Sequence, residues 1–139
     1  MNQIINIVII SFSLILISCE DNDNNTLPES ATISGTVNFS GLFPETGDVL
    51  ITLDTNYPPQ GPPAAFAYIT ADALLNGTTY SYSFTDLPFR SYSALTVTYW
   101  SLGYATAGTD YSLVGSFIST IDLSQDNPDT TINIDATFD

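Results

Sequence analysis

The sequence predicts an all-β protein, a seven-stranded Greek-key β-sandwich that occupies residues 31–139. Apolar and polar residues alternate with a period of two in several short runs, and clusters of Gly, Pro, Asn, Asp and Ser separate these runs. No stretch of residues 31–139 carries a convincing helical period. Short alternating strands with turn signals between them, and no helices, are typical of a sandwich.

Each expected strand is defined by its alternation. The seven expected strands span residues 31–39, 49–53, 64–69, 80–85, 92–100, 112–121 and 132–138. We expect the sixth to be bent or bulged near Gly115, and we expect residues 72–77 to form either one helical turn or an irregular loop. In the fifth strand, Leu95, Val97 and Tyr99 should face the core, which places Trp100 on the opposite face or at the strand end.

A proline-rich stretch lies between the second and third expected strands. Residues 57–63 hold four prolines, which cannot donate backbone hydrogen bonds to a sheet, so an extended exposed loop is expected. This loop is either a stiff crossover between strands, which we favour, or a proline-rich recognition segment.

The first eighteen residues have the length and composition of a signal peptide. They carry no charged side chain, and the apolar run from Ile4 to Ile17 is shorter than the roughly 20 residues that span a bilayer. The sequence Leu16-Ile17-Ser18-Cys19 that ends this run resembles the lipobox of bacterial lipoproteins. The resemblance implies cleavage before Cys19 and lipidation of its thiol. An uncleaved anchor helix with an incidental cysteine, or a free thiol, is the alternative.

A short acidic segment follows the cysteine. Glu20, Asp21 and Asp23 lie among asparagines and resemble the export signal of surface lipoproteins in the Bacteroidetes. Residues 19–30 are equally well described as a disordered, solvated tether. The two interpretations are compatible, and together they predict an outer-membrane lipoprotein of the bacterial cell envelope, a candidate for surface exposure.

Composition excludes several classes of function. The formal charge is −14 and Arg90 is the only basic side chain, so nucleic acid is not an expected partner. The chain has no His, no Lys and one Cys, which removes the usual catalytic triads, Schiff bases and common zinc sites. We therefore expect no enzyme and no cofactor, and we assign no metal site. A calcium ion near Asp122, Asp126, Asn127 and Asp129 is a minor alternative, because turns are ordinarily rich in these residues.

A second resemblance covers residues 31–139. The segments 33–37, 49–53, 80–88 and 132–134, in this order, are similar to the carboxypeptidase regulatory-like domains, which are transthyretin-type (prealbumin-like) sandwiches. The sequence departs from that pattern at Phe89-Arg90 and at the proline-rich insertion. The resemblance implies a non-catalytic accessory module.

These observations predict a lipid-anchored accessory or scaffold module of the cell envelope. Its expected partners are the membrane, through acyl chains on Cys19, and a protein or a glycan. The alternative is a carbohydrate-binding lipoprotein whose ligand platform consists of Trp100, Tyr92 and Tyr104, with Tyr111 nearby. We favour the other interpretation of Trp100, in which it packs beneath the loop at residues 103–110 and serves the fold alone.

Overall fold

The computed structural model describes residues 27–106 and 108–139, and it is predominantly β. Within these residues one short helix, α1 (Ala71–Leu75), accompanies ten strands. The strands are β1 (Ala31–Gly41), β2 (Asp48–Asp54), β3 (Ala65–Thr70), β4 (Thr79–Leu87), β5 (Ser91–Tyr92), β6 (Ala94–Trp100), β7 (Ser112–Phe117), β8 (Ile121–Asp122), β9 (Asp129–Thr131) and β10 (Ile134–Phe138).

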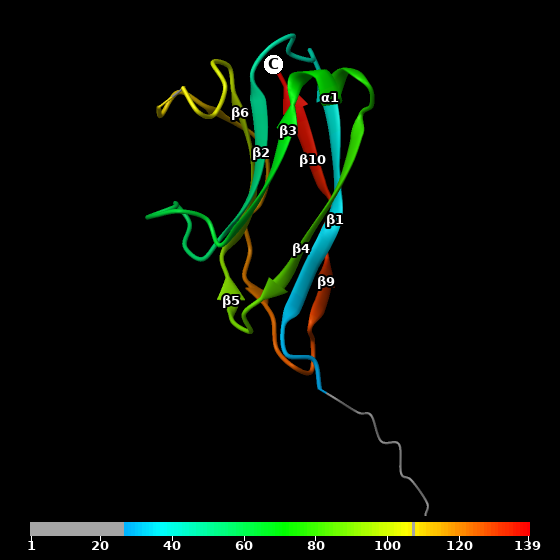
Figure 1. The fold of residues 1–139 in the computed structure, drawn as a ribbon, viewed down its shortest axis with the longest axis vertical. Helices are drawn as coiled ribbons and strands as arrows, with labels where there is room; N and C mark the ends of the chain where they lie inside the picture. Colours follow the sequence, from blue (N-terminus) through cyan, green and yellow to red (C-terminus); the bar gives the residue numbers. More distant parts are fainter. Residues whose placement is uncertain (1–26, 107) are drawn as a thin grey trace, which may run out of the picture.

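Most strands belong to one mixed sheet that curls over the core. Its order is β3-β2-β6-β7-β10-β1-β4, with β9 also paired to β1, while β5 and β8 form a separate two-stranded sheet. β1 runs parallel to β9 and β10, and the other pairs are antiparallel. In Figure 1 the half with β2, β3 and β6 faces the half with β1, β4 and β10. The all-β class is confirmed, and the sheet is continuous and curled.

The core lies between the two halves because apolar side chains alternate toward it. Val49, Ile51 and Leu53 of β2 are fully buried, and Leu95 and Val97 of β6 lie beside them in register. Burial of each such side chain contributes about 1.5–3 kcal/mol. The predicted facing of β6 is therefore correct, and Trp100 lies on the outer face.

Two of the expected strands are divided in the structure, and an additional strand, β9, precedes the last expected one, which accounts for ten strands rather than seven. Residues 92–100 split at Ser93, whose backbone N–H donates to the Asp54 carbonyl (2.8 Å) and whose hydroxyl donates to the Thr55 carbonyl (2.8 Å). These bonds direct Ser93 toward the end of β2 and separate β5 from β6. Residues 112–121 divide into β7 and β8, and the predicted bulge near Gly115 is present as a register shift opposite Val97 and Thr98.

The last expected strand, residues 132–138, corresponds to β10, and Ile132 and Asn133 separate it from the unexpected strand β9 beside β1. The Asn133 side-chain oxygen accepts hydrogen bonds from the backbone N–H and the hydroxyl of Thr36, each at 3.0 Å. A side chain thus occupies the place of a backbone carbonyl in the ladder. β9 pairs with β1 before this point and β10 pairs with it afterwards.

The segment 72–77 contains the short helix α1 rather than an irregular loop. Thr70 caps its start, since its hydroxyl accepts a hydrogen bond from the Ala73 N–H at 3.4 Å. Leu74 is buried and attaches this turn to the core. Among the described residues, no helix is long and apolar enough to cross a membrane.

Candidate functional site

A groove of about 520 Å³ lies on the outer face of the β2–β6 half of the sheet. Two loops flank it: residues 57–63, which connect β2 to β3, and residues 101–111, which connect β6 to β7. Figure 1 shows both loops projecting from the same side of the sheet. The sheet supplies the floor of the groove, and the loops supply its walls.

One wall is aromatic and is organised by Trp100. The Trp100 ring stacks on Tyr111, with centroids 4.6 Å apart, and meets Tyr104 edge to face at 5.0 Å. Both tyrosines remain about half exposed, at 48% for Tyr104 and 50% for Tyr111. The wall therefore presents aromatic surface to solvent while the rings fix one another's orientation.

Backbone contacts hold this wall in place at the start of the loop. The Gly103 N–H donates to the Trp100 carbonyl at 3.0 Å, and Gly103 has a φ of +79°, which favours glycine. The next residue, Tyr104, donates its backbone N–H to Asp48 Oδ2 at 2.9 Å. Asp48 of β2 thus ties the Tyr104 wall to the sheet.

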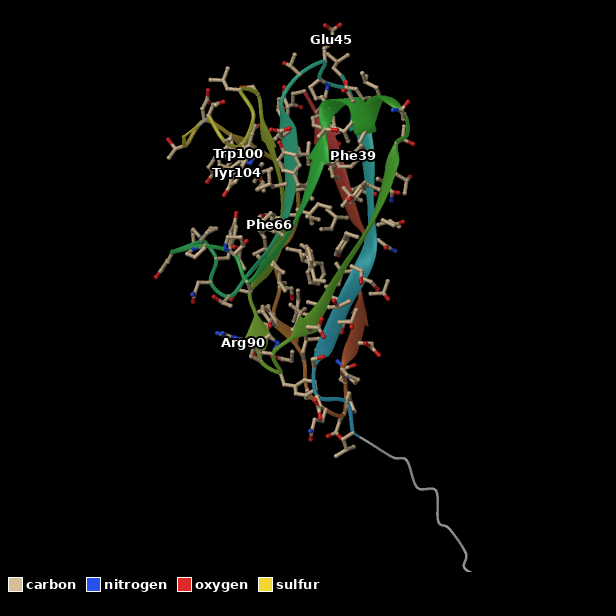
Figure 2. The ribbon with its side chains drawn as sticks, viewed as in Figure 1. Phe39, Glu45, Phe66, Arg90, Trp100 and Tyr104 are labelled. Atoms are coloured by element: carbon tan, nitrogen blue, oxygen red, sulfur yellow. The ribbon has the colours of Figure 1, made fainter. Side chains whose placement is uncertain are left out.

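The opposite wall combines the proline-rich loop with an aromatic ring from β3. Phe66 is 60% exposed and lies in register with Thr52 of the floor, while Tyr57 of the loop is 38% exposed. Figure 2 shows Phe66 below Trp100 and Tyr104 on the same side of the sheet. The stretch 57–63 is exposed, as expected, but it is a hairpin connection between the neighbouring antiparallel strands β2 and β3 rather than a crossover, and it lines the groove.

The floor is polar and almost closed to solvent. Thr96 and Thr98 are 4% and 8% exposed, and Asp54 is 4% exposed. Thr52 Oγ1 donates to Asp54 Oδ2 at 3.0 Å and lies 2.6 Å from Thr96 Oγ1. Trp100 Nε1 donates to the Thr98 hydroxyl at 2.9 Å. The side chains of the floor are therefore oriented by a hydrogen-bond network within the protein.

Asp54 is the one charged residue among the described residues that line the groove. Burial raises the pKa of its carboxyl group above the ordinary value, and the hydrogen bond from Thr52 opposes this effect. A poorly solvated carboxylate in a groove is typical of a binding or catalytic position. Asp54 occupies an outward position of β2, so sequence alternation could have indicated its facing but not its burial.

The predicted platform residues divide between the groove and the core. Trp100 and Tyr104 line the groove together with Tyr111. Tyr92 does not, because it is 1% exposed and its hydroxyl donates to the Pro88 carbonyl at 3.0 Å. Its inclusion was wrong because the break at Ser93 ends the alternation that would have placed Tyr92 beside Thr96.

The residues of the predicted lipobox and export signal lie outside the described part of the chain. They are Leu16, Ile17, Ser18, Cys19, Glu20, Asp21 and Asp23.

The calcium alternative concerned the acidic turn at residues 122–129. In residues 27–106 and 108–139, no group of three or more His, Cys, Asp or Glu side chains is arranged to hold a metal ion. Asp122 instead accepts a hydrogen bond from the Ser91 hydroxyl, and its carbonyl accepts from the Asn127 side chain at 3.3 Å.

Comparisons with protein-family models, curated proteins and solved structures found no match to this chain. The lipobox and the resemblance to carboxypeptidase regulatory-like domains remain predictions from the sequence.

Proposed function

We propose that the protein is a non-enzymatic, lipid-anchored accessory of the bacterial cell envelope that binds a saccharide in the groove. One observation carries the saccharide proposal: exposed aromatic rings and a preorganised polar floor line the same groove. The groove volume of about 520 Å³ lies within the range of roughly 300–1,000 Å³ that is usual for ligand sites. Presentation of such a groove is compatible with the accessory role predicted from the sequence.

The two kinds of surface match the two kinds of group on a sugar ring. The exposed rings of Tyr104, Tyr111 and Phe66 offer apolar area to the C–H groups of a pyranose. Hydroxyl and carboxylate groups of Thr96, Thr98 and Asp54 offer fixed hydrogen-bond partners for sugar hydroxyls. A ligand with only apolar groups would leave the remaining hydrogen-bonding capacity of this floor unused.

The charge of the groove restricts the saccharide and the chemistry. Arg90, the only basic residue of the chain, lies toward the opposite end of the domain from Trp100 and Tyr104, with its guanidinium 5.9 Å from the centroid of the Tyr92 ring (Figure 2). Uronic acids and sulfated glycans would meet the Asp54 carboxylate without a balancing cation. Hydrolysis of a glycoside ordinarily uses two carboxyl groups about 5–10 Å apart. The described lining contains one, which favours binding without cleavage.

The proposed anchor would leave the groove open. The described chain starts at the end of the domain away from Glu45, whereas the groove opens on the side, between the two loops (Figure 2). A tether that leads from Cys19 to this end would hold the domain at the membrane with its groove accessible.

Phe66→Ala is expected to weaken saccharide binding about fivefold, which corresponds to roughly 1 kcal/mol for one stacking ring. Affinity electrophoresis of the full-length protein in mild detergent, through gels that contain neutral or amine-bearing polysaccharides, measures this loss. Phe117→Ala is the matched control, since it makes the same change at a residue of β7 that is 36% exposed and does not line the groove. Equal effects of the two variants, or no retardation by any polysaccharide, would contradict the proposal.

A further inference from the structure

The hydroxyl protons of the groove floor that lie beside Asp54, those of Thr52 and Thr96, are donated within the protein itself. The single hydroxyl proton of Thr52 is donated to Asp54, so the short contact between Thr52 and Thr96 requires Thr96 to be the donor. The indole N–H of Trp100 is donated to Thr98. What remains for a ligand beside Asp54 is acceptor capacity: carboxylate lone pairs and the free lone pairs of Thr96.

The charge of the groove also favours a ligand that donates hydrogen bonds. The only charge in the described lining is negative, and the whole chain carries a formal charge of −14. Asp54 is a buried residue, and the one hydrogen bond to its carboxylate in the described residues comes from Thr52. A bound cation would therefore stabilise a carboxylate that water solvates poorly. The neighbouring aromatic faces also favour a cation.

We propose that the groove selects glycans with free amino groups, and that it places a protonated amine of a hexosamine unit against Asp54. This inference rests on the proposed saccharide function and specifies its ligand class. The aromatic walls bind the sugar rings, whereas Asp54 and Thr96 accept hydrogen bonds from the ammonium group and its neighbouring hydroxyls. An N-acetylated sugar keeps one N–H but loses the charge, and a plain hexose has neither an N–H nor a charge.

Three oligosaccharides with one skeleton test the selection. Hexamers of β-1,4-linked glucose, N-acetylglucosamine and glucosamine differ only at carbon 2, and calorimetric titration of the full-length protein in detergent compares them. At about pH 6 the amines carry their protons, and at about 150 mM salt the Debye length is only about 8 Å. We expect the glucosamine hexamer to bind about tenfold more tightly than the glucose hexamer.

Asp54→Asn should reduce that preference to about twofold or less, because the amide keeps the shape and accepts from Thr52 but carries no charge. Glu45→Gln removes the same charge from an exposed site at the end of the domain and should leave the preference intact (Figure 2). A melting curve verifies that each variant is folded. Equal affinities of wild-type protein for all three hexamers would overturn the selection and leave saccharide binding standing. A preference for glucosamine that survives in Asp54→Asn would also overturn it, and no binding of any hexamer would overturn both proposals.

Discussion

Gly35→Ala is expected to lower the free energy of unfolding by about 3 kcal/mol, because a β-carbon at this position has no room. It would lie 1.8 Å from the backbone carbonyl oxygen of Ile132 and 3.2 Å from the Tyr82 hydroxyl. These two groups are hydrogen-bonded to each other at 2.7 Å in the core. Relief of the clash must move the β9–β10 connection away from β1, which strains the bond from Tyr82 and the 2.8 Å bond from the Ile132 N–H to the Ser34 carbonyl.

Chemical denaturation followed by circular dichroism measures this loss. Gly77→Ala is the matched control, because a β-carbon there has no heavy atom within 4 Å. We expect its free energy of unfolding to match that of the wild type or to rise slightly. Similar destabilisation by both substitutions would contradict the claim that Gly35 is needed for the close approach of β1 to Ile132.

Cys19→Ala is expected to abolish lipidation, because Cys19 is the only thiol in the chain. Each buried methylene of an acyl chain contributes about 0.8 kcal/mol, and stable anchoring requires two chains or an additional signal. Without the thiol, the proposed lipid has no attachment site. Detergent phase partitioning and the intact mass should show lipidated wild-type protein in the detergent phase, and a variant that is either uncleaved or released.

Ser18→Ala controls for a change beside the cleavage position, because it keeps a small residue and the cysteine. We expect this variant to be lipidated like the wild type. A wild-type mass without a lipid increment would contradict the anchor proposal.

Much of the sheet could be predicted because its facing is set by local alternation. Leu95 and Val97 are buried as the period of two requires, and Trp100 lies on the outer face. The bulge near Gly115 was also predictable, since glycine interrupts the side-chain pattern there.

The strand breaks could not be predicted, because each depends on a partner distant in the chain. Ser93 bonds to the end of β2, and Asn133 bonds to Thr36 of β1. In a strand, the local sequence pattern predicts that serine and asparagine face outward to solvent. Tyr92 was assigned to the wrong surface for this reason.

The groove could be predicted only in part. Trp100, Tyr104 and Tyr111 are close in sequence, so a shared aromatic surface was a natural hypothesis. The opposite wall comes from residues 57–63 and Phe66, and only the pairing of β2 with both β3 and β6 brings it across the floor. Thr96 illustrates the same limit, because alternation predicts an exposed residue and the structure shows a buried member of the floor.

Trp100 is the only tryptophan of the chain and lies in the groove, so its fluorescence reports on the proposed site without a label. Titration of the full-length protein in detergent with the glucosamine, N-acetylglucosamine and glucose hexamers tests saccharide binding most directly. The proposal predicts a saturable change in emission with at least one hexamer, together with protection of Trp100 from quenching by acrylamide. Unchanged emission and unchanged quenching at saturating concentrations of all three would contradict the assignment of this groove as a saccharide site.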